Sequence, residues 1–330
     1  MKLFRVFQYI LCCLFLITAR TEDTASIQHY IRRGESISLI CIDYYGHYTR
    51  QMGTEIMSLN PWISDINVIE AGKTLRLPRP QNAAASTTPS ATPEKSAPAL
   101  FERNLEMRQG VITCVEGRAY IMRQGSEKRE TLLVNSIVSP GDIIETDSDG
   151  RVEIIINRES VCRIRENSRV VLDAFRDPGS GIDQTNMSLD NGTVWTRVKR
   201  VAGRLRRFEL SLPTAIAGVH GTVYQAAVHP DSSSEVKVYS GEVKVERRPE
   251  PTPQHISASE VREVSGPHEI RGPHEVSMEE WVRIVQAMQK VYIGRDGVAE
   301  NVSGFARDPQ SCWERWNEER DLRIAEIFGE

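Results

Sequence analysis

The chain has 330 residues, with 41 Lys and Arg against 45 Asp and Glu, a formal net charge of −4 and a pI near 6.1. This length allows two or three domains, each with its own core, and the balanced charge gives no reason to expect a nucleic-acid partner. The hydrophobic fraction of 40% is typical of an ordinary soluble protein.

The first residues have the pattern of a secretory signal. Lys2 and Arg5 precede an apolar run from Val6 to Thr18, and Ala19 is small enough for cleavage. The run is shorter than the roughly 20 residues of a membrane span, so we expect residues 1–19 to be removed. This predicts a periplasmic or secreted protein. If the segment stays uncleaved, it anchors the chain in the inner membrane, and only then does the protein contact a membrane.

Residues 27–80 carry the pattern of a small β-α-α-β module. Tyr30 begins a stretch that turns at Gly34 into a helix, for which Ser36 is the expected N-cap. At the other end, Gly72 permits a turn into an alternating strand that Pro78 closes.

This order and spacing resemble the LysM module, which in that family binds the N-acetylglucosamine backbone of peptidoglycan or chitin. The resemblance implies a groove between the first strand–helix turn and the loop before the last strand. The implied carbohydrate-binding residues are Gly34, Glu35, Ser36 and Ile37 on one side and Pro61, Trp62, Ile63 and Ser64 on the other. Backbone groups and a hydroxyl would bind the N-acetyl amide, while Ile and Trp cover its methyl group and the ring. The alternative is a module that is kept only as a fold.

Residues 81–103 are rich in Ala, Ser, Thr and Pro, which predicts a flexible linker. Residues 104–247 then show short alternating stretches separated by turn signals such as Pro140-Gly141, Asn191-Gly192 and Ser240-Gly241. Regular short strands without intervening helices predict a β sandwich or a β-roll.

The segment Ala215-Ile216-Ala217-Gly218-Val219, followed by Gly221-Thr222 and alternating apolar residues, resembles the FecR-type periplasmic domain. Val138 to Thr146, Gly150 to Ile154, Leu189 to Trp195 and Gly241 to Val245 extend the resemblance to about residues 108–247. The family is best known for transmembrane regulators that relay the state of an outer-membrane receptor to a cytoplasmic sigma factor. Only Met1 to Arg5 precede the apolar run, so we expect an exported form of the domain without the sigma-binding part.

Residues 248–276 read as a polar connector, and residues 277–330 as a helical tail. Ser277 to Glu280 has capping-box spacing, and Trp281, Ile284, Val285, Met288 and Val291 would share one helix face. A second helix is expected from Asp308, as N-cap, to about Ile327. The fold class predicted for the whole chain is multidomain α+β: a LysM-like module, a mainly-β domain and C-terminal helices.

Motifs for catalysis are missing, because the chain has no Gly-x-Ser-x-Gly elbow, no His-Glu-x-x-His and no phosphate-binding Gly loop. His268-Glu269 and His274-Glu275 lie in a short duplication, but a Pro precedes each His, which favours an extended turn over a metal site. Basic residues from Arg197 to Arg207 alternate with apolar residues, which is typical of a pair of strands with one solvent-exposed face. We therefore expect no enzyme activity, no cofactor and no metal.

Of the cysteines that remain after cleavage, Cys114 and Cys162 are expected to point to different faces of their strands, which favours isolated thiols.

Three functions remain open. The first is a wall-anchored protein that binds peptidoglycan, or another N-acetylglucosamine polymer, and presents the β domain as a scaffold or sensor to an envelope partner. The second is a component of a FecR-type signalling pathway that acts through protein contact without wall binding. The third, a wall-modifying enzyme, is disfavoured by the missing catalytic constellations.

Overall fold

The computed structural model describes residues 26–79, 109–156, 160–175, 183–199, 206–219, 221–248 and 281–328. The expected signal peptide and linker lie outside these ranges, and so do the His268/His274 duplication and the connector after Arg248. In the part of the chain that is described, no helix is long and apolar enough to cross a membrane.

The N-terminal module, residues 26–79, consists of a strand, two helices and a strand. They are β1 (Ser26–Tyr30), α2 (Ile37–Tyr45), α3 (Arg50–Leu59) and β2 (Thr74–Pro78). β1 pairs antiparallel with β2, and Ser36 caps α2 by accepting a hydrogen bond from the Leu39 N–H. Local sequence signals therefore fix the element order, although this order does not by itself identify a family.

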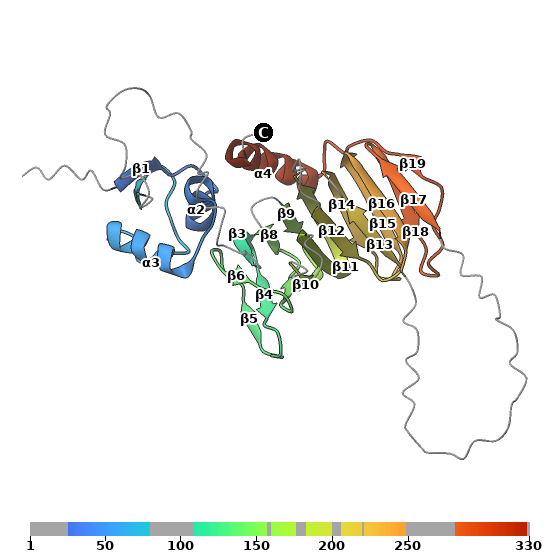
Figure 1. The fold of residues 1–330 in the computed structure, drawn as a ribbon, viewed down its shortest axis with the longest axis horizontal. Helices are drawn as coiled ribbons and strands as arrows, with labels where there is room; N and C mark the ends of the chain where they lie inside the picture. Colours follow the sequence, from blue (N-terminus) through green and yellow to red (C-terminus); the bar gives the residue numbers. More distant parts are fainter. Residues whose placement is uncertain are drawn as a thin grey trace, which may run out of the picture.

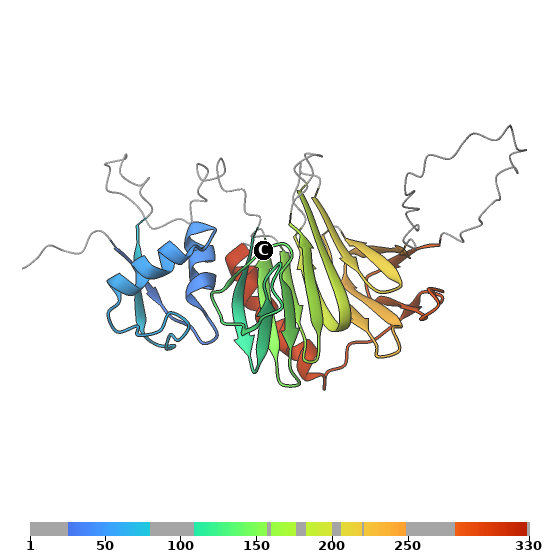
Figure 2. The same cartoon turned by 90° about the horizontal axis from the view of Figure 1, so that it is seen from below.

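The larger domain is a two-layer β structure whose layers share the long strand β11 (Asp183–Val198). We call the first layer the covered sheet; its order is β6 (Ile137–Val138), β3 (Gly110–Glu116), β8 (Arg151–Ile156), β9 (Ser160–Ile164), β11, β14 (Val223–Val228), β15 (Ser234–Ser240), β18 (Gln289–Ile293) and β19 (Ser303–Gly304). The second sheet has the order β5 (Arg129–Thr131), β4 (Ala119–Met122), β7 (Ile143–Thr146), β10 (Arg169–Ala174), β11, β12 (Arg206–Ser211), β13 (Ala215–Val219), β16 (Glu242–Arg247) and β17 (Val282–Gln286). One apolar core fills the space between them. This domain is thus mainly β, as predicted, and Figure 2 shows these strands side by side beside the module.

The predicted turn at Asn191-Gly192 is instead a bend within β11. Strand residues up to Asn191 pair with β10 in the second sheet, and residues from Gly192 onward pair with β14 in the covered sheet. Gly192 has φ +92°, and a Cβ there would lie 2.1 Å from the Ser168 Oγ. The bend therefore requires glycine, and it lets one strand serve both layers.

The helix predicted over Trp281 to Val291 is wrong, because this segment forms β17 and β18. Val285 and Val291 are buried in the core between the sheets, whereas Ile284 is 48% exposed. The apolar residues of this segment are three and four residues apart, which fits a helix, but within each short stretch apolar and polar residues also alternate. Pairing of β17 with β16 and of β18 with β15 favours the strands. The β domain consequently extends to Gly304, and only the last part of the predicted tail is helical.

That helix, α4 (Cys312–Phe328), begins a few residues later than predicted, with the Ser311 Oγ rather than Asp308 accepting the hydrogen bond from the Glu314 N–H. α4 lies along the outer face of the covered sheet, and its C-terminal end comes beside α2 of the N-terminal module, as Figure 1 shows. Helix and module thus cover the same sheet face.

Candidate functional site

The first side of the predicted sugar groove faces the rest of the molecule. Gly34 forms a left-handed turn at φ +79°, and its carbonyl accepts a hydrogen bond from Arg320 Nη1 of α4 at 2.9 Å. Arg320 and Arg323 are the side chains nearest to the position of a Cβ at Gly34. This turn is a contact between the module and α4.

Glu35 belongs to a small polar cluster inside the module. Its Oε2 accepts hydrogen bonds from the Arg32 N–H at 2.7 Å and from His29 Nε2 at 2.9 Å. Burial acts to raise the pKa of Glu35, but the hydrogen bonds with His29 and Arg32 outweigh it and hold the pKa below its ordinary value. The Glu35 carboxylate therefore stabilises the turn between β1 and α2 by hydrogen bonds.

Ser36 and Ile37 are buried. The Ser36 Oγ caps α2 and lies 3.1 Å from the Ser38 Oγ, and Ile37 belongs to the apolar core of the module. That core continues into the β domain, where Val111 and Ile155 of the covered sheet join it. Ser36 and Ile37 are consequently closed off against the β domain, whereas Gly34 is exposed and Glu35 is half-buried.

The second side is only partly open. Pro61, Trp62 and Ser64 are exposed, with Trp62 at 37%, whereas Ile63 is buried in the module core. Lys73 Nζ lies 4.9 Å from the centre of the Trp62 ring. Pro61 and Trp62 line a hollow of about 400 Å³ whose remaining walls are Gln28, Leu59, Asn60, Thr74 and Arg76. The structure thus does not bring the two predicted sides together around one open groove.

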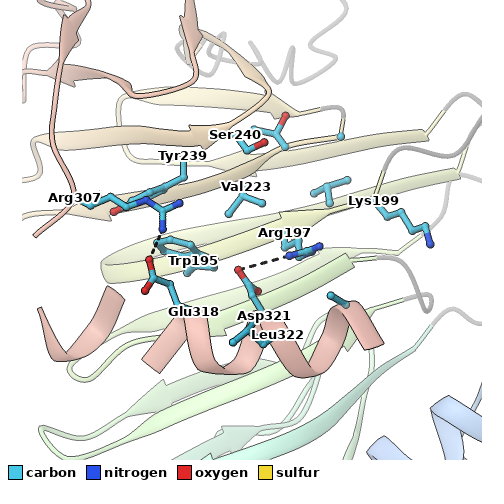
Figure 3. Close-up of a pocket in the computed structure, with 14 residues that line it drawn as sticks. Trp195, Arg197, Lys199, Val223, Tyr239, Ser240, Arg307, Glu318, Asp321 and Leu322 are labelled. Atoms are coloured by element: carbon cyan, nitrogen blue, oxygen red, sulfur yellow. Dashed lines mark hydrogen bonds and ion pairs between the residues drawn. The ribbon is translucent and has the colours of Figure 1, made fainter. Parts of the chain in front are cut away.

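A larger groove lies on the covered sheet beside α4. It has a volume of about 650 Å³, and Figure 3 shows side chains of α4 facing those of strands β11, β14 and β15 across it. Its walls include Trp195, Tyr239 and Val223 of the sheet and Glu318, Asp321, Leu322 and Ala325 of the helix. Leu322 is 73% exposed, and the indole N–H of the buried Trp195 has no hydrogen-bond partner among the described residues. The groove thus has an aromatic floor with the exposed Leu322 beside it.

Charged residues frame this groove. Arg197, Lys199 and Arg307 line it together with Glu318 and Asp321, and Arg307 pairs with Glu318. Arg197 Nη1 lies 3.8 Å from Asp321 Oδ2. From the predicted basic run the structure therefore places Arg197 and Lys199 at the groove; residues 200–205 lie outside the described part.

Aromatic side chains attach α4 to the sheet. Trp313 and Trp316 stack with their ring centres 5.4 Å apart and pack against Trp195 and Tyr239. The Trp313 indole donates to Gln225 Oε1 at 3.0 Å, and the Trp316 indole donates to Glu116 Oε1 at 2.8 Å. These tryptophans are packing residues between α4 and the covered sheet.

A charge network that no sequence motif predicted lies under α4. Glu153 of β8, which is fully buried, accepts a hydrogen bond from Arg163 Nε of β9 at 2.8 Å and two from Arg320 of α4. Burial acts to raise the pKa of Glu153, but the two guanidinium groups reverse the effect and lower it to about 2. Arg163 also pairs with Asp321 at 2.8 Å. The network ties α4 to the sheet.

The described part of the chain contains no group of three or more His, Cys, Asp or Glu side chains placed to hold a metal. Its cysteines are free thiols. Cys114 packs with the α4 aromatic cluster and Cys162 lies in the core between the sheets, so they face opposite sides, as predicted. Burial raises the pKa of Cys162 to about 12 and that of Cys114 to about 11, which makes both weak nucleophiles.

Residues 142–244 match the model of a protein family described as FecR protein. The chain therefore contains a FecR domain, in the stretch from β7 to β16, while no match supports a LysM domain. No curated protein matches the chain.

Two crystal structures of a candidate anti-sigma factor from Parabacteroides distasonis, at 1.65 and 2.50 Å resolution, resemble the chain at 14% sequence identity each, with TM-scores of 0.34 and 0.32. They cover 53% and 51% of this chain, and the chain spans 64% and 61% of theirs, which is under two thirds.

Proposed function

We propose that this chain is an envelope regulatory or scaffold protein whose FecR domain binds a partner protein in the groove beside α4. The observation that carries the proposal is the groove itself, in which exposed Leu322 stands beside the buried Trp195 and Tyr239. Exposed apolar side chains beside an aromatic surface with a charged rim are typical of protein-binding sites. The proposal involves no chemical reaction and no cofactor.

A photo-crosslinking amino acid at position 322 of the exported chain tests this proposal in intact envelopes. We expect a discrete protein adduct from position 322 and none from position 319, because Glu319 is exposed but does not line the groove. Adding unlabelled wild-type chain should reduce the adduct, whereas adding the Leu322→Asp variant should not. The same weak adducts from both positions would contradict a partner at the groove.

Sugar binding by the N-terminal module is the second candidate. It is supported by the module's β-α-α-β order and by the exposed Trp62 ring above the hollow next to β1 and β2. Indole faces stack on sugar rings, so Trp62 is the residue best placed to contact a polysaccharide.

Co-sedimentation with insoluble peptidoglycan tests the second candidate. We expect the full chain to sediment and the Trp62→Ala variant to remain largely in the supernatant, with Tyr30→Ala, another exposed aromatic of the module at 64%, as the matched control. Equal sedimentation of all three chains would show that Trp62 does not contribute to sugar binding. If none of them sediments, the sugar candidate is wrong and protein binding at the groove is the function that remains.

A further inference from the structure

A loop of the β domain inserts one side chain into the N-terminal module. Asn135 lies between β5 and β6, and its side chain is buried although it belongs to a loop. Its Oδ1 accepts a hydrogen bond from the Ser38 N–H at 2.8 Å, and its Nδ2 donates to the Ile66 carbonyl at 2.9 Å. The carboxamide thus satisfies a donor and an acceptor of the module at once.

The two partners come from separate segments of the module. Ser38 lies in the first turn of α2, where backbone N–H groups have no acceptor within the helix, and Ile66 lies in the loop between α3 and β2. Ser38 directly follows the four residues predicted for the first side of the sugar groove, and Ile66 lies two residues beyond those predicted for the second side. An N–H group beside a carbonyl forms a pair that recognises an amide, because an amide presents both complementary groups.

The loop is held in place for this contact. The Asn135 N–H donates to the Ile112 carbonyl at 2.8 Å, and the Ser38 Oγ donates to that same carbonyl at 3.2 Å. Asn135 has a left-handed backbone with φ 64°, a conformation that asparagine tolerates better than most residues. Strand β3 therefore positions both the loop and the module.

We propose that the Ser38 N–H and the Ile66 carbonyl form an amide-binding site, that Asn135 fills it from within the same chain, and that the N-acetyl group of a sugar competes with Asn135 for it. This inference rests on the second candidate function, sugar binding by the module. An N-acetyl group carries the same carbonyl and N–H as the asparagine side chain, whereas a plain glucose polymer carries neither. The docked module is consequently a closed form, and sugar binding requires it to leave the β domain.

Docking then weakens sugar binding in the intact chain. The apparent affinity is the affinity of the undocked module multiplied by the fraction of molecules in which the site is free. Removing the Asn135 side chain deletes two hydrogen bonds of the closed form, which corresponds to roughly a tenfold or larger increase in that fraction.

The experiment compares three full chains that begin at residue 20: wild type, Asn135→Gly and Asn167→Gly. Glycine keeps the left-handed backbone of both positions, and Asn167 (φ 56°) is a matched loop asparagine in the β domain that does not contact the module. Isothermal titration uses the tetramer of N-acetylglucosamine and, as the probe without amides, cellotetraose. We expect Asn135→Gly to bind the N-acetylated tetramer about tenfold or more tightly than the other two chains, with no gain for cellotetraose.

Hydrogen exchange at the Ser38 amide provides the second readout, and it should become faster in Asn135→Gly only. Equal binding of the tetramer by all three chains would overturn the competition while leaving sugar binding by the module intact. Faster exchange at Ser38 without tetramer binding by any chain would overturn both the inference and the sugar candidate. Should Asn135→Gly fold poorly, Asn135→Asp, which keeps the acceptor and removes the donor, is expected to show a smaller gain of the same sign.

Discussion

At the scale of single residues, the buried charge network beneath α4 is the feature with the largest expected energetic effect. Glu153 and Arg163 have no solvent exposure, and Arg320 is almost fully buried, so each charge depends on its partners. The Thr113 Oγ1 supplies one more hydrogen bond to Glu153 Oε1, at 2.7 Å. A buried carboxylate with this many donors stays ionised over the whole physiological pH range.

Replacing Glu153 by Gln should destabilise the protein by about 3–5 kcal/mol, because two buried guanidinium groups lose the carboxylate between them and only Arg163 keeps another, Asp321. Urea unfolding monitored by tryptophan fluorescence measures this change. The matched control is Glu318→Gln, whose exposed pair with Arg307 should contribute less than about 1 kcal/mol. Equal losses in the two variants would contradict the importance assigned to burial.

The same carboxylate predicts acid sensitivity. The pKa of Glu153 is lowered from 4.5 to about 2, so its contribution to stability is fully present above about pH 4.5 and is lost as the pH falls towards 2. The free energy of unfolding of the wild type should therefore decrease by about 3 kcal/mol from this group across that window. In Glu153→Gln this component of the decrease should be missing.

At the scale of elements, the segment from Val282 to Ile293 shows how tertiary pairing selects between two local structures. Val282 and Val285 are three residues apart, so they would lie on the same side of a helix but on opposite faces of a strand. In β17 the first is 48% exposed and the second is fully buried. The two residues therefore provide a direct test of the strand.

Val285→Asp should destabilise the β domain by about 3 kcal/mol or more, because it places an unpaired charge in the core between the sheets. Val282→Asp, the same chemical change on the exposed face, should alter the midpoint of thermal unfolding by only a few degrees. Circular dichroism of both variants makes the comparison. Similar losses in both would favour the helix predicted from the sequence over β17.

At the scale of the whole molecule, α4 joins parts of the chain that are far apart in sequence. Its tryptophans pack on the covered sheet, its Ile324 lies in the apolar cluster shared by the module and the β domain, and its Arg320 reaches the Gly34 carbonyl. The helix α4 thus contacts both the covered sheet and the N-terminal module and links the two. We expect changes in the last turns of α4 to release the module.

Ile324→Asp should separate the module from the β domain while the β domain stays folded, because the new charge lies in the apolar cluster between them. Small-angle scattering of the full chain should show a larger radius of gyration than the wild type. Leu322→Asp, two residues away and exposed, should leave the radius unchanged. An unchanged radius in Ile324→Asp would argue against a joint role of the helix.

Much of the local structure followed from the sequence alone. The N-cap at Ser36 and the turn at Gly34 depend on neighbouring residues, and the motifs around Gly218 indicated the FecR domain that the family match confirms. The opposite faces of Cys114 and Cys162 also followed from strand phase. LysM membership and sugar binding stay predictions.

Contacts between distant segments were decided only by the tertiary structure. Asn135 and Ser38 are 97 residues apart, and Arg320 and Glu153 are 167 apart, so no local period connects them. A partial signal existed in Ile154-Ile155-Ile156, where an unbroken apolar run indicates a strand covered on both faces. This apolar run does not identify what covers the outer face of the sheet, because that depends on how α4 and the N-terminal module pack on it. Local sequence therefore determined most elements, whereas long-range packing turned residues 282–293 into strands, separated the two predicted sides of the sugar groove and formed a different groove beside α4.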